Sequence, residues 1–420
     1  MSNSGYMKIN TEIDIQECII ENNINGNSSN DENDITLTDN SITIRDSLDD
    51  NEVRLESIIK QEQKPKRVYW VDWLRVFASM LVVYIHCSGI ALKPRKLFSY
   101  NWNVLFFHNS IPRPAVPLFL MISGIFFLNP KRKLSYKKLY KKNVVRLIKC
   151  YVVWVLYYKI INTYIINYTG RKYVFNMDLV KQALKNIITI RTHEHLWYLR
   201  TALYLYILTP LFRIISARKK LAWMITIFFI IFTQFIPTVF YYPLDKKNSV
   251  HHILDITGNI SFGVYFFMGY LLYDYTFSKR IYVYLIELIG FASIFLTIHL
   301  RFMACHRKNK ENNDFGSTES FNVALSAYGI FTFFQYTVND RIEPLMKKRN
   351  IKKVIMKMSE CSFGVYLTHM TVYHFFYRIG LHSQTFNPVW WVIVYSALVY
   401  VFSFILTFLL RKIPFVKSII

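Results

Sequence analysis

The sequence has few cysteines, and they lack the spacing of a disulfide framework or a metal site. The five are Cys18, Cys87, Cys150, Cys305 and Cys361. They form no CxxC pair and no combination of Cys and His of the kind that binds zinc. We therefore expect neither a disulfide-stabilised small domain nor a bound metal ion.

The N-terminal region lacks a basic segment followed by an apolar stretch, so we expect no cleavable signal peptide. Residues 1–63 are rich in Asn, Asp, Ser and Glu, and contain too few apolar residues to offset the chain entropy that folding costs. We interpret them as a disordered acidic cytosolic tail. The apolar span that starts near Trp70 is predicted to act as the insertion signal.

Acidic residues are scarce beyond this tail. Residues 64–420 hold 13 Asp and Glu against 47 Lys and Arg, whereas residues 1–63 hold 14 Asp and Glu against 4 Lys and Arg. A basic excess of this size is compatible with nucleic acid binding, but the basic residues lie between apolar runs rather than on a soluble face. We therefore predict no nucleic acid partner and interpret the basic residues as markers of membrane topology.

Apolar residues, in contrast, are abundant. The chain is 53% hydrophobic and 17% aromatic, more than a soluble core of this length can bury, so membrane lipid is the predicted solvent. With about 20 residues for each crossing, ten apolar spans are predicted, at residues 70–92, 112–128, 148–168, 196–215, 221–240, 256–275, 281–300, 321–337, 360–380 and 389–410.

The basic loops support this arrangement. Runs of Lys and Arg precede the first span, separate spans 2 and 3, 4 and 5, 6 and 7, and 8 and 9, and follow the last span, so all of them lie on one side. By the positive-inside rule that side is cytosolic. The predicted fold class is an all-α membrane protein, a bundle of about ten transmembrane helices with cytosolic N- and C-termini, in the plasma membrane or an internal membrane.

The first span carries four polar residues where lipid is expected: Asp72, Arg75, Ser79 and His86. At 100° per residue they fall within an arc of roughly 60°. A charged group near the middle of a span costs on the order of 2.5–3.5 kcal/mol, so this stripe should face the bundle interior or a wet cavity. Pairing of Asp72 with Arg75 at the membrane surface is the alternative, but it leaves His86 unexplained.

The stripe has the form DWLRxxAxxxVxxxH, which resembles the first helix of the acyltransferase 3 family of membrane acyltransferases. Three further stretches resemble that family in the same order: VPLFLMISGIFFL with Ser123, HLWYLRTALYLYILTPLF with His195 and Trp197, and SFGVYLTHM with Tyr366 and His369. Together the four stretches span residues 70–410. Residues 64–420 are accordingly predicted to form a transmembrane acyltransferase domain.

The resemblance implies transfer of an acyl group, most often acetyl, from cytosolic acyl-CoA to a hydroxyl of a saccharide or other acceptor. It also implies that His86 is the essential base or acyl-relay residue and that Arg75 is essential beside it. A rise of roughly 1.5 Å per residue separates the two by about 16 Å. A guanidinium can hold donor phosphates or carbonyls, and an imidazole can take the proton of an acceptor hydroxyl near neutral pH.

A second family element is an RxxR pair at the start of the third helix, and the matching residues are Arg146 and Lys149. Both are predicted to bind the donor. Lysine keeps the charge but loses the planar fork, which puts bidentate phosphate recognition in doubt at Lys149. The alternative is that both residues are further positive charges of a cytosolic loop.

Other candidate substrate-binding residues lie near the remaining spans. In span 9, Ser362, Tyr366, His369, Tyr373 and Tyr377 share one helical face, which predicts either a hydroxyl-lined cavity or an aromatic packing stripe.

Glu194 and His195 are predicted at the non-cytosolic mouth of span 4, where the carboxylate can orient the imidazole or where both are loop groups. Trp197 is a candidate through the resemblance alone. Ser123 has no base beside it in the sequence, so it is either a substrate contact or a helix-packing residue.

The leading prediction is therefore an enzyme whose partners are membrane lipid, acyl-CoA and a saccharide or lipid-linked acceptor. A transporter or exporter of saccharides or lipids is the alternative, because internal polar groups among ten helices also describe such proteins. Paired half-repeats, which are typical of transporters, are absent from the sequence. A receptor or inactive scaffold is a third interpretation, and the intact Arg75 and His86 argue against it. The acceptor and the oligomeric state are left open.

Overall fold

The computed structural model describes residues 67–161, 181, 195–243 and 258–420, and all regular structure within them is helical. This confirms the all-α prediction. The predicted acidic tail at 1–63 and Glu194 lie outside the described residues, so the predictions made for them stay predictions.

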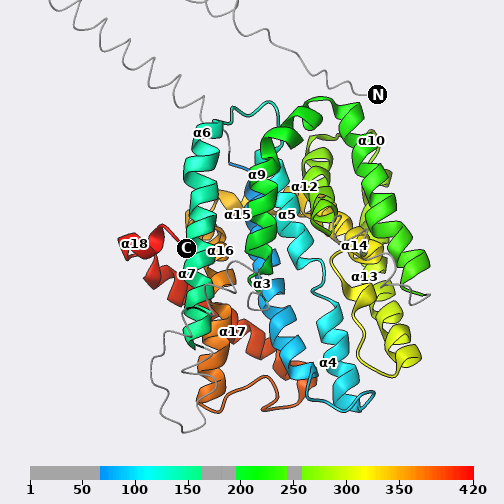
Figure 1. Cartoon of the computed structure of the whole chain (residues 1–420), viewed down its shortest axis with the longest axis vertical. Helices are drawn as coiled ribbons and strands as arrows, with labels where there is room; N and C mark the ends of the chain where they lie inside the picture. The colour runs from blue at the N-terminus through cyan, green and yellow to red at the C-terminus, as the bar shows by residue number, and fades with distance from the viewer. Residues whose placement is uncertain (1–66, 162–180, 182–194, 244–257) are drawn as a thin grey trace, which may run out of the picture. The chain divides into compact units, whose positions relative to one another are not determined.

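Fourteen α-helices and several π-helical or 3-10 turns are described (Figure 1). In chain order they are α3 (Tyr69–Leu92), α4 (Tyr100–Ser110), α5 (Ala115–Phe127), α6 (Tyr136–Lys138), η1 (Leu139–Val144), α7 (Val145–Ile161), α9 (Trp197–Ala217), α10 (Lys219–Ile230), η3 (Ile231–Phe235), η4 (Pro237–Tyr241), α12 (Gly258–Asp274), α13 (Arg280–Lys308), η5 (Asp314–Gly316), α14 (Phe321–Thr332), η6 (Phe333–Val338), α15 (Asn339–Lys347), α16 (Arg349–Arg378), α17 (Pro388–Leu410) and α18 (Pro414–Lys417).

Six helical stretches among the described residues are long and apolar enough to cross a membrane. They are Tyr69–Leu92, Tyr100–Phe127, Trp197–Ala217, Lys219–Tyr241, Arg280–Lys308 and Pro388–Leu410. The other four predicted spans fall on α7, α12, α14 with η6, and α16, which are helical but do not meet the same criterion. The structure thus supports a membrane protein, while the count of ten spans stays a prediction.

The second span differs from its predicted limits of 112–128. It is built from two helices, α4 and α5, that together run from Tyr100 to Phe127. The break falls at Pro112-Arg113-Pro114, because proline cannot donate the backbone hydrogen bond that would continue a helix, yet fits its first turn. The short polar α4, with its Asn and His residues, was therefore missed as a membrane segment.

Helix α3 lies at the centre of the bundle and packs against α4, α5, α16 and α17. Trp70, Leu74, Ala78 and Val82 on this helix are all buried. Because α3 has neighbours on several sides, its polar stripe is enclosed by protein, as the cost of placing charge in lipid requires.

Two glycines allow one helix pair, α5 and α12, to approach closely. A Cβ atom at Gly124 of α5 would lie 1.9 Å from the Phe266 carbonyl oxygen of α12, and one at Gly269 would lie 2.0 Å from the Met121 carbonyl oxygen of α5. These distances are below van der Waals contact, so only glycine fits at either position. The Ser123-Gly124 motif thus has a packing role through its glycine.

Gly269→Ala is expected to lower the thermal midpoint of the purified protein, because the added methyl must push α5 and α12 apart. Overpacking of this kind typically costs about 1–3 kcal/mol. Gly263→Ala on the same helix is the matched control, since its Cβ would meet nothing closer than the Phe212 ring at 3.8 Å. Equal midpoints for the two variants would contradict the close approach.

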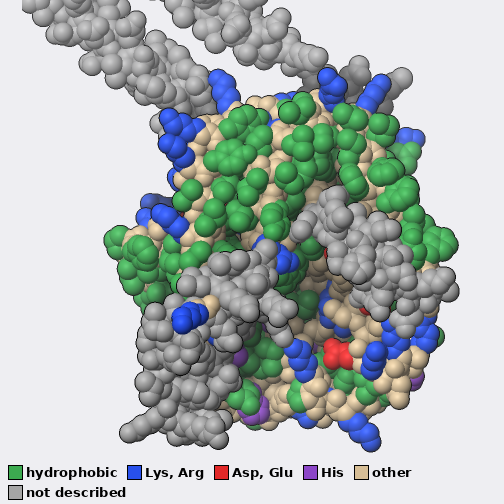
Figure 2. Space-filling model, viewed as in Figure 1, with side chains coloured by type: hydrophobic (Ala, Val, Ile, Leu, Met, Phe, Trp, Pro, Cys, Tyr) green, Lys and Arg blue, Asp and Glu red, His purple; other side chains and the backbone are tan. Residues whose placement is uncertain are grey.

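One end of the bundle carries a group of basic loops, and we call it the basic end. Lys131 and Lys219 both pair with Asp274, which joins the loops after α5, α9 and α12. Arg213 donates to the carbonyl groups of Phe127 and Asn129 at 2.9 Å. Figure 2 shows hydrophobic side chains covering much of the upper part of the visible face, with Lys and Arg along its upper edge.

Candidate active site

Arg75 is held in position by a three-residue network at the first turns of α3. Its Nη1 lies 3.6 Å from Asp72 Oδ1 and donates to Ser359 Oγ of α16 at 3.0 Å. Ser359 Oγ in turn donates to Asp72 Oδ1 at 2.6 Å. The Asp72 side chain is 5% exposed and that of Arg75 28%. The two residues therefore pair, as one reading of the sequence had it, but inside the bundle and against α16.

The Arg75 side chain lines a cavity of about 230 Å³ between α3, α5, α9 and α16. Among the described residues that line it, Arg75 alone carries a charge. The walls are apolar except for five hydroxyl groups, which belong to Ser123, Tyr198, Tyr206, Ser362 and Tyr366. A chamber of this kind, with one cation at its end and scattered hydroxyls, suits an extended and mostly apolar ligand that ends in an anionic group.

Ser123 contributes its hydroxyl to this cavity. Its Oγ donates to the Phe119 carbonyl at 3.0 Å, and the side chain lines the cavity together with Tyr198 and Tyr206. The sequence left open whether Ser123 contacts substrate or packs helices. The structure divides these roles, because Gly124 provides the close helix approach and Ser123 faces the cavity.

Three histidines from distant parts of the sequence meet beside this cavity. The ring centroids of His86 and His369 are 5.1 Å apart, those of His195 and His369 5.2 Å, and those of His86 and His195 6.1 Å. The three side chains come from α3, from the residues just before α9, and from α16. We call this group the histidine cluster.

Hydrogen bonds to backbone carbonyls fix two members of the cluster. Tyr366 Oη donates to the His195 carbonyl at 2.5 Å, and His369 Nδ1 donates to the Tyr366 carbonyl at 2.7 Å. Because Nδ1 of His369 carries the proton, Nε2 is the basic nitrogen of its neutral ring. Tyr158 packs edge-on against His195 with a centroid distance of 4.7 Å.

The cavity ends close to the histidine cluster. Val82 lines the cavity and precedes His86 by four residues, which is about one helical turn. Tyr366 also lines it, and its ring centroid lies 6.0 Å from that of His195 and 6.3 Å from that of His369. A ligand that fills the chamber from the Arg75 end would thus bring its far end to the cluster.

Tyr366→Phe is expected to reduce turnover by roughly two- to tenfold, because it removes one hydrogen bond, worth about 0.5–1.5 kcal/mol, and keeps the ring. The lost bond is the one that fixes the His195 backbone, so the effect should appear in kcat rather than in the KM for the donor. The measurement is steady-state acyl transfer. Tyr157→Phe, which removes a bond to Thr371 away from the cavity, is the control.

Arg146 and Lys149, the RxxR-like pair, do not line the cavity that Arg75 lines. Arg146 donates to the carbonyl of Ile420, and its guanidinium lies 5.7 Å from the ring centroid of Phe363, which lines the cavity. Arg146 is not among the residues that line the chamber. Lys149 is exposed and is not among the residues that line it.

Two other predicted residues lie away from the cavity. Ser79 is 1% exposed, donates to the Val76 carbonyl at 2.7 Å and lies 3.2 Å from the Tyr400 hydroxyl, so it joins α3 to α17. Trp197 packs against Phe262 with a centroid distance of 5.4 Å.

The predicted stripe of span 9 divides along its length. Ser362 and Tyr366 line the cavity, and His369 belongs to the histidine cluster. Tyr373 instead lies against Ser383 and Tyr395, and Tyr377 is 59% exposed. Both interpretations of the stripe therefore apply, each to a different part of the helix.

Two residues of the site were missed from the sequence. Ser359 precedes Ser362 by three residues and Tyr366 by seven, so it shares their helical face, and this spacing was a usable signal. Tyr158 lies among several tyrosines of α7 and donates to the Leu367 carbonyl at 2.6 Å. Nothing in the local sequence distinguishes it from its neighbours.

Within the described part of the chain, no three side chains of His, Cys, Asp or Glu are placed so that they could hold a metal ion, and this includes the histidine cluster.

Comparison with known proteins identifies the family of this chain. Residues 68–408 match the acyltransferase 3 family, which is described as an acyltransferase domain. No curated protein matches the chain significantly. No solved structure does either. The match covers more than half of the chain and includes the cavity and the histidine cluster, so the chain belongs to the acyltransferase 3 family of membrane acyltransferases.

Proposed function

We propose that this protein transfers an acyl group, most simply acetyl, from acyl-CoA to a hydroxyl of a saccharide or lipid-linked acceptor. The donor enters at the basic end, which faces the cytosol, and the acceptor reaches His86 from the opposite side of the membrane. Ten membrane spans with both termini in the cytosol complete this proposal.

The observation that carries the proposal is the cavity that is lined by Arg75 and also by Val82, which lies one helical turn from His86. Its volume of about 230 Å³ is smaller than most sites for whole nucleotides, but it suits an acyl group and the thioester arm behind it. The nucleotide of the donor would remain outside, near Arg75 and the lysines of α6 and η1. The apolar walls exclude water, which would otherwise hydrolyse the thioester.

Arg75 is suited to bind the donor because its orientation is fixed before the donor arrives. Asp72 and Ser359 contact Nη1 and so set the direction in which the guanidinium lies at the cavity wall. A planar guanidinium makes two parallel bonds to a phosphate and single bonds to amide carbonyls. Preorganisation of this kind avoids the entropy cost of ordering a long side chain during binding.

His86 is the group that we assign to the chemical step. As a neutral imidazole it accepts the proton of the acceptor hydroxyl while the hydroxyl oxygen attacks the thioester carbonyl carbon. The carbon–sulfur bond breaks, and the CoA sulfur leaves and takes up the proton from the imidazolium. A two-step route, in which the ring nitrogen is acylated first, balances equally with the acceptor as the second nucleophile.

His195 and His369 both lie beside His86 and help to hold its ring. Their backbone and Nδ1 hydrogen bonds with Tyr366 fix their own positions, so they present a rigid surface to His86. A rigid surface beside a general base limits the rotation of its ring, and orientation contributes strongly to such catalysis.

The proposal is tested by acyl transfer in membranes that contain the full chain, with radiolabelled acetyl-CoA added on the cytosolic side. Label should appear in a glycan or glycolipid fraction with the parent protein and fall to background with a double His86→Ala and Arg75→Ala variant. Equal labelling by the two proteins would overturn the assignment. Movement of saccharide across the membrane without acyl-CoA would favour a transporter.

A further inference from the structure

A second polar cluster lies at the break between α4 and α5, outside the cavity described above, and contains two arginines. Arg301 of α13 is 0% exposed, and its guanidinium lies 4.5 Å from the Phe106 ring centroid. Arg113, between Pro112 and Pro114, keeps partial exposure. We call these two residues the arginine pair.

All acceptors of the arginine pair within the described residues are neutral. Arg113 donates to the carbonyls of Asn109 and Gly316 at 3.0 and 3.1 Å, and also to Asn109 Oδ1. Arg301 donates to Ser110 Oγ and, at 3.3 Å, to Asn109 Oδ1. Two guanidinium groups carry ten N–H donors, so about half of them are unused by these five bonds.

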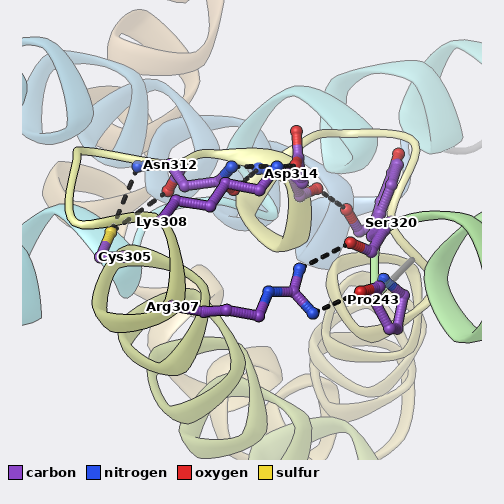
Figure 3. A network of polar contacts seen from close by, with 8 residues as sticks. Pro243, Cys305, Arg307, Lys308, Asn312, Asp314 and Ser320 are labelled. Carbon is purple, nitrogen blue, oxygen red and sulfur yellow. Dashed lines mark hydrogen bonds and ion pairs between the residues drawn. The ribbon is translucent and has the colours of Figure 1, made fainter. Parts of the chain in front are cut away.

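The nearest carboxylates do not neutralise the pair. Asp314 is engaged by Lys308 Nζ at 3.2 Å and by Asn312 Nδ2 at 2.9 Å, as Figure 3 shows. Glu311 is exposed and attracts both arginines electrostatically, but it makes no direct ion pair with either of them among the described residues. Two like charges held close together without a carboxylate in direct contact are costly, and an arriving anion would reduce that cost.

The loop that covers the pair is fixed, so the site is preformed. Figure 3 shows two hydrogen bonds that fix the residues after α13. The Asn312 backbone N–H donates to Cys305 Sγ, and Ser320 Oγ donates to the Asp314 carbonyl. This loop carries Gly316, and a Cβ there would lie 2.6 Å from Arg301 Nε. Only glycine allows the loop to approach the buried guanidinium so closely.

The arginine pair adjoins both the cavity and the turn of α3 that carries His86. Arg113 precedes Val116, which lines the cavity, by three residues. Asn109, which accepts from both arginines, donates through Nδ2 to the Ile85 carbonyl at 3.1 Å and to Ser88 Oγ at 3.3 Å. Ile85 and Ser88 flank His86 in the sequence. An anion held by the pair would thus lie beside the reacting end of the cavity.

We infer that the arginine pair binds an oxyanion group of the acceptor, so that the enzyme acylates an acidic saccharide or lipid-linked saccharide rather than a neutral one. The inference rests on the proposed function, because it names the class of acceptor. A carboxylate and a phosphate share the chemistry that a guanidinium recognises. Arg113 would make the direct contact, and Arg301 would supply charge and hold Asn109 and Ser110.

The test is binding of D-glucuronate, glucose 1-phosphate and D-glucose to the purified full chain, at constant ionic strength, through the ligand dependence of the thermal midpoint. We expect at least one of the two acids to bind roughly tenfold or more tightly than glucose, and Arg113→Gln to remove that preference. Whichever acid binds better identifies the group as carboxylate or phosphate. His86→Ala should keep the preference, which separates this inference from the catalytic proposal.

Arg378→Gln, an exposed arginine at the end of α16, is the matched control and should keep the preference. Arg113→Lys tests whether a lost preference comes only from misfolding. It retains the charge, so it should retain part of the preference. Equal binding of acids and glucose by the parent protein, or a preference that survives Arg113→Gln, would overturn the inference and leave the arginine pair with a structural role. If the parent protein shows the acid preference but transfers no acyl group, the catalytic proposal fails and the binding inference stands.

Discussion

His86→Ala is expected to reduce the rate of acyl transfer by about 10²- to 10⁴-fold, which is the range that a general base typically contributes. If the ring is acylated during the reaction, the loss will lie at or beyond the upper end of that range. Affinity for acyl-CoA should change little, because Arg75 lies about 16 Å away along the helix. The measurement is kcat for labelled acetyl transfer, together with equilibrium binding of the donor.

The matched control is His299→Ala, which removes an exposed histidine from α13. It should leave both transfer and binding unchanged. A further comparison is His369→Ala, which breaks the cluster without removing the base and should reduce kcat by less than His86→Ala does. If His299→Ala and His86→Ala were equally active, the histidine cluster would not be the reacting centre.

Arg75→Ala is expected to raise the KM for acyl-CoA by roughly 10- to 100-fold, because hydrogen bonds to charged groups contribute about 1.5–3 kcal/mol. Arg75→Lys should lie between the parent and the alanine variant, since lysine keeps the charge and loses the planar fork. The acceptor KM should be unaffected. The measurement is the initial rate as a function of acyl-CoA concentration at fixed acceptor.

A double variant separates donor binding from stability. Arg75→Ala removes a cation from beside the buried Asp72 carboxylate, which can destabilise the fold. Arg75→Ala combined with Asp72→Asn removes the carboxylate charge as well. If the combined variant recovers thermal stability but not donor affinity, Arg75 binds the donor. Recovery of both would mean that Arg75 acts only through its pair with Asp72.

The features that depend on a single helix could be predicted from the sequence. The spacing of Asp72, Arg75, Ser79 and His86 placed them on one helical face, and the cost of charge in lipid required that face to turn inward. Asp72 and Ser79 are buried and Arg75 lines the cavity, as that argument predicts. Helical periodicity and membrane energetics act locally along one helix, so no partner helix had to be known.

The boundary of the second span was predicted less well. Its prolines indicated an interruption, but the polar α4 before them did not meet the expected hydropathy of a membrane segment. Its polar groups are satisfied by tertiary partners instead, such as Asn109 by α3 and by the arginine pair. A segment whose polar atoms are paired through the fold cannot be recognised from composition alone.

The meeting of His86, His195 and His369 was decided by tertiary structure, because residues separated by more than 100 positions meet only when α3, α9 and α16 pack together. The same holds for Ser359 between Asp72 and Arg75, and for Arg113 beside Arg301. Periodicity determines which way a side chain points from its own helix. The packing of whole helices against one another decides which side chains meet, and glycines allow the closest of these helix contacts, as between α5 and α12.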